Sequence, residues 1–282
     1  MANRFSGKTV FITGAGSGIG YQTALAFAGE GANIIATDVD LAGLQQLKPE
    51  VEQLGAQCHT YSLDVTDEPT YEALASQLEA DGLIPDIVVN NAGLGIMSPF
   101  LETTTAEWQL TLNVNVLGVV LGCRLFAAIW QRLGRPGHLV NVSSMAAIAP
   151  PTNLSAYVAS KYAVEGLSEV LAMEFMDSTI EISCLHPGVI NTAIVQHSSR
   201  ARMAPGEMER LQRHYVEEGV HPRVVAQDIV DGVFNGTGTI LSGKGVRGVA
   251  FMKRLLPRKQ FRKILIDASR KMGYFPEKNP GA

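Results

Sequence analysis

Tyr157 and Lys161 carry the clearest chemical signal in this sequence, as the ends of the run Tyr157-Val158-Ala159-Ser160-Lys161. About one helical turn separates the two residues, so a phenol and an ammonium group would share one face of a helix. Ser144 lies thirteen positions before Tyr157 and adds a hydroxyl group. A phenol next to a cation is suited to proton transfer, so these residues predict acid/base chemistry.

A glycine-rich turn, Thr13-Gly14-Ala15-Gly16-Ser17-Gly18-Ile19-Gly20, follows the first apolar run of the chain. Its glycines allow a tight turn and a close approach to a pyrophosphate, whose charge the N-terminus of the next helix stabilises. This pattern predicts a dinucleotide site that includes Gly14, Ser17, Gly18, Ile19 and Gly20.

Asp38 lies eighteen residues after Gly20, at the end of the second apolar run, where an acid can accept the adenosine ribose hydroxyls. Its carboxylate would repel a 2′-phosphate, and neither Ser17 nor Val39 offers a compensating cation. The cofactor is therefore expected to be NAD rather than NADP. Without the glycine turn, Asp38 would equally fit a helix N-cap or a surface acid.

Short runs rich in valine and isoleucine alternate with amphipathic stretches. This alternation predicts an α/β protein with a doubly wound Rossmann fold, in which a seven-stranded parallel sheet carries helices on both faces. Strands are expected at residues 9–13, 33–37, 57–62, 87–90, 138–143, 180–186 and 239–241. Helices are expected at residues 18–29, 40–54, 67–80, 105–133, 156–176 and 224–234.

The domain organisation is read as one Rossmann-type domain over residues 1–243 and a basic C-terminal extension over 244–282. Residues 190–222 are polar and irregular, so they are interpreted as a mobile lid over the substrate. Three widely spaced cysteines suggest buried thiols and a reducing compartment, and no metal site is expected. A polar N-terminus favours a cytoplasmic location.

The net charge of −4 hides an uneven distribution, because residues 244–278 hold eleven of the 23 lysines and arginines against two acids. After Pro257, an amphipathic helix would carry cations on one face and apolar side chains on the other, namely Phe261, Ile264, Leu265, Ala268 and Met272. Packing onto the acidic body is favoured over peripheral membrane contact. No nucleic-acid partner is expected.

Six motifs in order resemble those of the short-chain dehydrogenase/reductase family, in its single-domain subgroup. They are TGAGSGIG at 13–20, NNAG at 90–93, Asn115-x-x-Gly118, Ser144, YVASK at 157–161 and Pro187-Gly188. The resemblance spans residues 6 to about 240. It departs from the family pattern at Ala147, where a glycine is common, and at the basic end of the chain.

The resemblance implies that Tyr157 is the general acid or base and that Ser144 holds the substrate oxygen. Lys161 would lower the pKa of Tyr157 and bind the nicotinamide ribose, and Asn115 would position a water of a proton relay. A free tyrosine has a pKa of about 10. At roughly 5 Å and an effective dielectric of about 20, a lysine favours phenolate by on the order of 3 kcal/mol, or about two pKa units.

The same resemblance implies further cofactor contacts. Asp64 would bind the adenine, Asn90 would lie on the adenosine side and Thr192 would contact the carboxamide. The remaining cofactor positions are Val65, Ala92, Gly93, Pro187, Gly188, Val189 and Ile190, together with Tyr157 and Lys161.

The expected substrate pocket is apolar, which suggests a steroid, a retinoid or an aliphatic alcohol. Its residues are Leu94, Ile96, Met145, Ile148, Leu154, Ile194, Val195 and Met203. The function predicted is an NAD-dependent oxidoreductase interconverting a secondary alcohol and a ketone. A homodimer or homotetramer is expected through the long helices. A non-catalytic NAD-binding sensor or scaffold is the alternative, and an extended-type epimerase fits less well.

Overall fold

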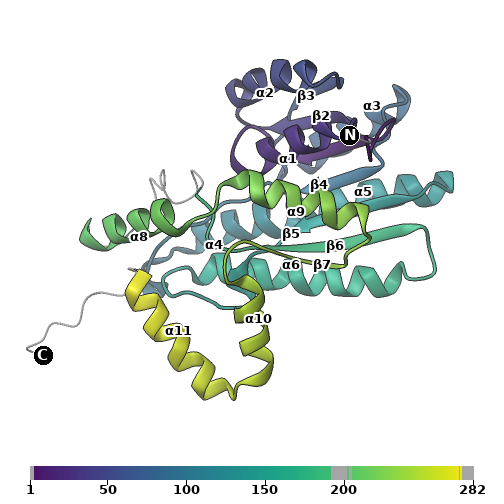
Figure 1. The fold of residues 1–282 in the computed structure, drawn as a ribbon. Helices are drawn as coiled ribbons and strands as arrows, with labels where there is room; N and C mark the ends of the chain where they lie inside the picture. The colour runs from purple at the N-terminus through teal and green to yellow at the C-terminus, as the bar shows by residue number, and fades with distance from the viewer. Residues whose placement is uncertain (1–2, 192–201, 203–204, 273, 275–282) are drawn as a thin grey trace, which may run out of the picture.

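The computed structural model describes residues 3–191, 202, 205–272 and 274, and its centre is a sheet of seven parallel strands (Figure 1). The strands are β1 (Thr9–Thr13), β2 (Asn33–Asp38), β3 (Cys58–Ser62), β4 (Ile87–Asn90), β5 (Gly137–Val142), β6 (Ile180–Pro187) and β7 (Thr239–Ser242). Every predicted strand is present, within two residues of its expected bounds. Parallel strands covered on both faces are continuously apolar, which made these runs easy to recognise.

The strand order is β3-β2-β1-β4-β5-β6-β7, so the chain reverses its direction across the sheet between β1 and β4. Each neighbouring pair is parallel, for example Phe11 with Ile35 on one side and with Val88 on the other. Ligands of such sheets bind beyond the carboxyl ends of the strands at this switch point. The doubly wound fold predicted from the sequence is confirmed.

Helices α1 (Gly18–Gly29), α2 (Leu41–Gln53) and α9 (Pro222–Phe234) cover one face of the sheet. Their apolar side chains, such as Phe27, Leu47 and Ile229, form one core cluster with Val10 and Ile34 of the strands. Gly43 of α2 lies so close to the glycine turn that a Cβ atom there would be 2.3 Å from the Gly16 carbonyl oxygen. Packing therefore fixes the turn from behind.

Helices α3 (Glu68–Ala80), α5 (Gly118–Leu133) and α6 (Ser155–Glu174) cover the other face, and α4 (Thr105–Leu112) packs against α6. A π-helical turn, η2 (Asn113–Leu117), joins α4 to α5, so the single helix expected at 105–133 is interrupted. By length and composition Thr105–Leu133 could cross a membrane, yet half of its most apolar window is buried. This is the packing of a core helix.

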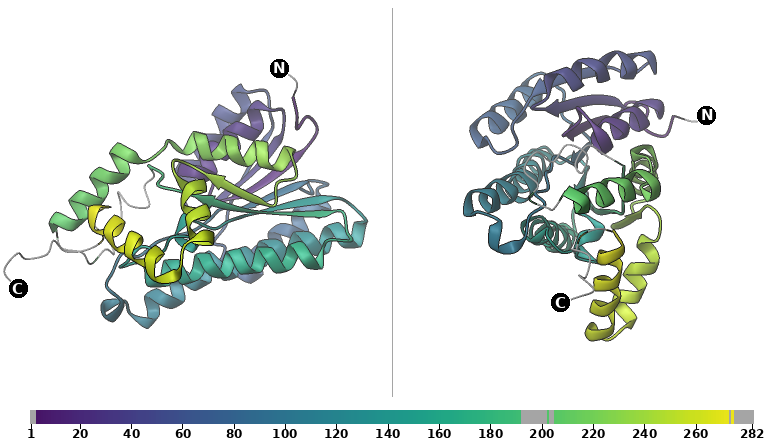
Figure 2. Two further views of the ribbon diagram at one scale, coloured as in Figure 1. Left: turned by 60° about the horizontal axis from the view of Figure 1, so that its bottom comes forward. Right: turned by 90° about the vertical axis from the view of Figure 1, so that its left-hand side faces the viewer.

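Three helices lie near the carboxyl ends of the strands (Figure 2). They are α8 (Pro205–Glu218), α10 (Val246–Leu255) and α11 (Arg258–Met272), and α11 runs next to both α8 and α10. The expectation of an irregular lid over 190–222 is wrong for its second part, because α8 is a regular helix. Its polar composition hid a narrow apolar stripe of Met208, Leu211 and Tyr215, which packs inward.

Short 3-10 turns complete the structure near the carboxyl ends of β4 and β5, at η1 (Phe100–Glu102) and η3 (Met145–Ala147). Ser144 caps η3, because its hydroxyl accepts a hydrogen bond from the Ala146 backbone N–H at 3.0 Å. The turn places Ser144 directly after β5, where the site is built.

Candidate active site

A cavity of about 570 Å³ lies beyond the carboxyl ends of the strands and joins two regions of different character. One region is lined by the glycine turn and by the ends of β2, β4 and β6. The other is lined by apolar side chains of the loop before α6 and of the C-terminal helices. Ser144, Tyr157 and Lys161 lie among the residues that line this cavity.

The glycine turn is held against β4 by a residue that the sequence analysis did not select. Asn91 donates hydrogen bonds from Nδ2 to the carbonyl oxygens of Thr13 and Gly14, at 2.9 and 3.0 Å. Gly14 and Gly18 have φ values of 66° and 56°, which favour glycine. A Cβ atom on Gly14 would lie 2.9 Å from the Cα of Ala92. The turn is thus shaped before any ligand arrives.

Gly20 does not line the cavity, so its prediction as a cofactor contact is corrected. A Cβ atom on Gly20 would lie 2.1 Å from the Gly14 carbonyl oxygen and 2.6 Å from Asn91 Nδ2. Glycine is needed there because helix α1 starts in contact with the turn. Its place in the glycine pattern serves packing, which spacing alone cannot distinguish from ligand contact.

Asp38 lies at the end of β2, facing the glycine turn. Its Oδ2 accepts the Gly16 backbone N–H at 2.8 Å, and its Oδ1 accepts the Asp40 N–H at 2.9 Å. No lysine or arginine pairs with Asp38 among the residues that the structure describes. A fixed, unneutralised carboxylate therefore stands beside the adenosine end of the cavity.

Most of the other predicted cofactor positions line the same cavity. They are Gly14, Ser17, Gly18, Ile19, Asp64, Val65, Ala92, Gly93, Pro187, Gly188, Val189 and Ile190. Asp64 is oriented by Thr66, whose backbone N–H and hydroxyl both donate to Oδ1, at 2.9 and 2.7 Å. Thr192 lies outside the described residues.

Asn90 is the exception, because its side chain points into the protein. It is buried, and its Nδ2 donates to Asn141 Oδ1 at 2.9 Å and to Cys123 Sγ at 3.4 Å. The predicted contact with the adenosine side is therefore corrected: the side chain joins β4 to β5 beneath the site. The neighbouring Asn91 is the asparagine that reaches the cofactor end.

Tyr157 and Lys161 come from the first turns of α6, and Ser144 comes from the end of β5. The Ser144 hydroxyl lies close enough to the Tyr157 phenol to act on its pKa as a hydrogen-bonding group. Lys161 Nζ lies 5.6 Å from the centre of the Tyr157 ring and donates to the Val142 carbonyl oxygen at 2.8 Å. The three groups are thus brought together at one point of the cavity, between its polar and apolar regions.

The electrostatics of this trio differ from the expectation. Burial raises the pKa of Tyr157 to about 12, against a smaller lowering by the Ser144 hydrogen bond. Burial also lowers the pKa of Lys161 to about 8. Removing a phenolate from water is costly, and the Lys161 ammonium is hydrogen-bonded to the Val142 carbonyl oxygen. The predicted net lowering of the tyrosine pKa is therefore wrong for the protein without a cofactor.

Asn115 lies in the π-helical turn η2 and is fully buried. Its Oδ1 accepts the Leu94 N–H, and its Nδ2 donates to the Leu94 carbonyl and to Ser160 Oγ, each at 2.9 Å. Both protons of its Nδ2 are therefore used, and the side chain does not line the cavity. The side chain joins the backbone of Leu94 to Ser160 of α6, and the relay-water role of Asn115 stays a prediction. The π-turn is typical of functional sites in helices.

The apolar end of the cavity is built largely from the C-terminal helices. Leu94, Met145 and Leu154 line it as predicted positions, whereas Ile96 and Ile148 are buried behind it. Those two are corrected because they pack into the core. Ile194, Val195 and Met203 lie outside the described residues. The side chains missed by the sequence analysis are Met97, Val249, Met252, Phe261, Ile264, Leu265, Ala268, Met272, Tyr215 and Tyr274.

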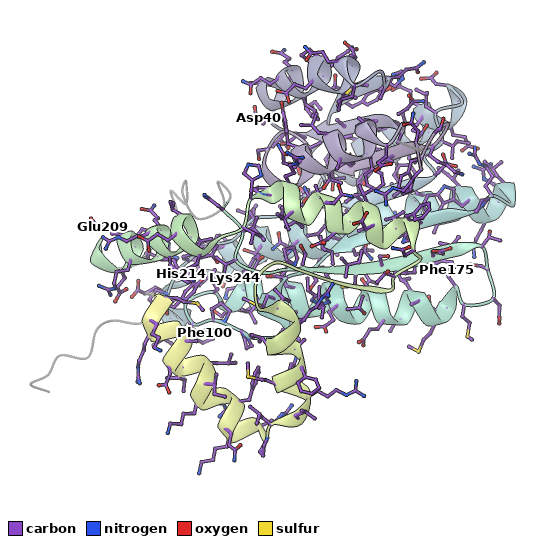
Figure 3. All side chains as sticks on the ribbon, in the orientation of Figure 1. Asp40, Phe100, Phe175, Glu209, His214 and Lys244 are labelled. Atoms are coloured by element: carbon purple, nitrogen blue, oxygen red, sulfur yellow. The ribbon has the colours of Figure 1, made fainter. Side chains whose placement is uncertain are left out.

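The basic segment folds onto the body of the protein through this apolar face. Lys253 of α10 donates to the Ala147 carbonyl oxygen at 3.0 Å and lies 5.0 Å from the centre of the Tyr162 ring. Lys244, labelled in Figure 3, pairs with Glu218 at the end of α8 at 2.6 Å. The amphipathic pattern of α11 is thus explained by a pocket wall on one side and solvent on the other.

Comparison with known proteins identifies the family of this chain. The family model described as short chain dehydrogenase matches residues 8–203. A probable oxidoreductase, EphD, of Mycobacterium tuberculosis is 41% identical over 237 residues. The chain belongs to the short-chain dehydrogenase family. This family match and the fold agree with the resemblance seen in the motifs.

The short-chain dehydrogenase relatives differ in length. The match to EphD covers 81% of this chain but only 40% of EphD, so the chain spans about two-fifths of that relative. The 3beta-hydroxysteroid dehydrogenase 1 of Eggerthella lenta is 35% identical over 216 residues, covering 75% of this chain and 81% of the relative.

Two crystal structures of the family share the fold and contain different cofactors. A short-chain dehydrogenase/reductase from Burkholderia phymatum in complex with NAD has a TM-score of 0.82 and 28% identity, covering 93% of this chain and 96% of its own. A metagenomic short-chain oxidoreductase in complex with NADP has a TM-score of 0.67 and 26% identity, covering 82% and 92%. Membership of the family thus leaves both nicotinamide cofactors open.

Proposed function

We propose that this protein is an NAD(H)-dependent oxidoreductase that interconverts a secondary alcohol and a ketone on an apolar substrate. The observation that carries the proposal is the convergence of Ser144, Tyr157 and Lys161 at the junction of a dinucleotide cradle and an apolar pocket. Proton-transfer groups at such a junction can act on a substrate oxygen while a cofactor lies beside the same carbon.

The cofactor assignment rests on the fit of the cradle. The glycine turn leaves a backbone surface that a Cβ atom at Gly14 would fill, and the Asp38 carboxylate stands beside it without a cation. A 2′-phosphate would meet an uncompensated negative charge there, whereas two ribose hydroxyls could donate to it. Gly14, Gly18, Asp38, Asp64 and Lys161 would hold the dinucleotide, which supplies or accepts the hydride when bound.

The protein contributes proton transfer and positioning. In ketone reduction, the Tyr157 phenol gives its proton to the developing alkoxide, and in alcohol oxidation the phenolate takes the hydroxyl proton. The Ser144 hydroxyl binds the same substrate oxygen from the other side and orients it. Lys161 stabilises the phenolate by its charge, and the raised pKa of Tyr157 keeps the acid form ready for reduction.

The substrate class follows from the lining of the far end of the cavity. Leu154, Met252, Leu265 and Met272 form a wall without charge. Such a wall favours an apolar body, as in a steroid, a retinoid or an aliphatic alcohol, and disfavours a sugar or an acid. The similarity to a 3beta-hydroxysteroid dehydrogenase supports the same class.

The test combines a substrate panel with one conservative variant. Alcohols and ketones of graded size are incubated with NAD or NADH while the NADH absorbance is followed. Tyr157→Phe should keep NADH binding, measured by fluorescence titration, and should lose about a hundredfold or more of kcat. The matched control is Tyr162→Phe, an exposed tyrosine on the same helix, which should change neither quantity.

The alternative, an NAD-binding protein without turnover, predicts a different result from the same experiment. NADH would bind with the Asp38-dependent preference, and no alcohol or ketone in the panel would be converted. Persistent activity of the Tyr157→Phe variant would instead show that the assigned proton donor is wrong.

A further inference from the structure

Two tyrosines form a pair inside the apolar end of the cavity. Tyr215 comes from α8 and Tyr274 from the segment after α11, and their hydroxyl oxygens lie 2.9 Å apart. Both residues line the cavity and pack in one cluster with Leu154, Met97 and the Tyr157 ring. Residues far apart in the sequence therefore bring two phenol hydroxyls into a wall that is mostly apolar, with Ser269 as a further polar residue.

The two phenols have one more donor proton than the hydrogen bond between them uses. Each phenol has one donor proton, and only one of the two protons can lie in the bond between the oxygens. Within the described residues, the two hydroxyls have no other hydrogen-bond partner than each other. One O–H donor therefore has no acceptor among the described residues, and a buried donor without an acceptor costs free energy unless a further group accepts it.

Hydrogen bonds from a neighbouring loop hold Tyr274 in place. The Tyr274 carbonyl oxygen accepts hydrogen bonds from Thr152 Oγ1 and Asn153 Nδ2, each at 2.9 Å. Asn153 adopts a φ of 58°, an uncommon conformation for a residue other than glycine. The loop that carries these two residues runs from Ser144 to Tyr157. The segment that begins at Ser144 and leads into the first turn of α6 thus also holds Tyr274.

We propose that the Tyr215–Tyr274 pair binds a second, neutral oxygen of the substrate, so that the preferred substrates are diols, hydroxyketones or diones with an apolar skeleton. This inference rests on the proposed function and specifies its substrate class. The spare phenolic proton would donate to the second oxygen, and the other phenol would hold the donor in position.

The oxygen should be neutral because of the charges around it. The charged side chains among the described cavity-lining residues are Asp38 and Asp64, at the cofactor end, and Lys161. A carboxylate at the tyrosine pair would be buried without a cation, which is strongly unfavourable. Burial raises the pKa of both Tyr215 and Tyr274, so both phenols keep their protons and remain donors.

The experiment compares substrates that differ only in a second oxygen. The probes are cyclohexanol against cyclohexanediol, and a steroid alcohol against the same alcohol carrying a ketone on its distal ring. The measured quantity is the selectivity, kcat/KM for the bifunctional probe divided by kcat/KM for the monofunctional one. One additional neutral hydrogen bond should give the wild type a selectivity of about tenfold for the probe whose second oxygen reaches the pair.

The variants are Tyr215→Phe, Tyr274→Phe and the double variant, with Tyr162→Phe as a control of the same chemistry outside the cavity. Each single variant should reduce the selectivity to near one, and the double variant should add little, because the two hydroxyls act as a unit. Thermal melting of each variant reports whether the fold is retained. Tyr162→Phe should leave the selectivity unchanged.

Three results would overturn the inference. Equal kcat/KM for both members of both probe pairs would show that no second oxygen is recognised. Retained selectivity in the double variant would assign recognition to another group. Turnover of no probe by the wild type would refute the proposed function and the inference with it, whereas turnover without selectivity would refute the inference alone.

Discussion

Replacing Asp38 by asparagine should remove the preference for NAD over NADP. The Asp38 carboxylate accepts the Gly16 N–H at 2.8 Å and has no cation among its described partners. A 2′-phosphate placed about 5 Å from this carboxylate would be repelled by it. At an effective dielectric of about 20, the repulsion is about 3 kcal/mol per phosphate charge. This corresponds to about a hundredfold weaker binding of NADPH than of NADH.

The assay is fluorescence titration of both reduced cofactors at two salt concentrations. In the wild type, the dissociation constant of NADPH divided by that of NADH should fall as salt is raised. Added salt screens the repulsion, because it shortens the Debye length from about 10 Å at 0.1 M to about 3 Å at 1 M. In Asp38→Asn the ratio should approach one and lose its salt dependence. NADH itself should bind about tenfold more weakly, since charge-assisted hydrogen bonds to the ribose are lost.

Asp40→Asn is the matched control, because Asp40 is an exposed acid two residues away (Figure 3) whose Oδ1 caps α2 at the Ala42 N–H. It removes the same charge without touching the glycine turn. Equal affinity for NADH and NADPH in the wild type at low salt would refute the reasoning. If Asp40→Asn changed the ratio of the two dissociation constants as much as Asp38→Asn does, this would also refute the reasoning.

Two further predictions concern packing and pH. Gly20→Ala should lower the free energy of unfolding by about 2 kcal/mol in urea titrations and weaken NADH binding, because its Cβ would meet the Gly14 carbonyl at 2.1 Å. Gly29→Ala, in the same helix with nothing within 4 Å, should change stability by less than about 1 kcal/mol. The rate of alcohol oxidation should increase as the pH is raised above 7, and the rate of ketone reduction should not. Oxidation needs phenolate, which is the minor form because the pKa of Tyr157 is raised to about 12. The rise should flatten above about pH 8, where Lys161 loses its proton; an oxidation rate independent of pH would contradict this assignment.

The sheet could be predicted from the sequence because its strands are buried on both faces. Runs such as Thr9–Thr13 and Ile87–Asn90 need no alternation, and the glycine turn marks the first crossover. Helix α8 could not be predicted in the same way. Its hydrophobic stripe is one residue wide, and its partners are Leu154 and Tyr274, which are distant in the sequence. A helix that packs through a single edge is mostly polar, so its composition resembles that of a solvated loop.

The positions of the proton-transfer groups were predictable, but their electrostatics were not. Motif order placed Ser144, Tyr157 and Lys161 at one site because each follows a recognisable strand or opens a helix. The pKa of Tyr157 depends instead on how completely the surrounding cluster removes water from the phenol, and Met97, Leu211 and Tyr274 belong to that cluster. The spacing of Tyr157 and Lys161 in the sequence allows the attraction between a lysine and a phenolate to be estimated. The cost of removing the phenolate from water depends on the whole folded pocket.

The asparagines show the same limit at the level of single side chains. Asn90, Asn91 and Asn115 all occur in motifs that suggest cofactor or proton chemistry. In the structure only Asn91 reaches the cavity, while Asn90 and Asn115 satisfy buried backbone and side-chain groups behind it. A buried amide and a ligand-binding amide have the same sequence signature, because both are polar residues inside apolar runs.

The C-terminal helices connect the charge distribution of the chain to its chemistry. A helix that closes an apolar pocket needs one apolar face toward the substrate, and the other face must be soluble. Lys253 fastens α10 to the Ala147 carbonyl, and Tyr274 fastens the end of α11 to Thr152 and Asn153. Both anchors lie on the loops that carry Ser144 and Tyr157. The wall that would recognise the substrate is thus held by the same loops that hold the reacting groups. Substitutions of pocket-lining side chains in α10 or α11 can therefore change the substrate preference without moving Ser144, Tyr157 and Lys161, provided that these two anchors stay in place.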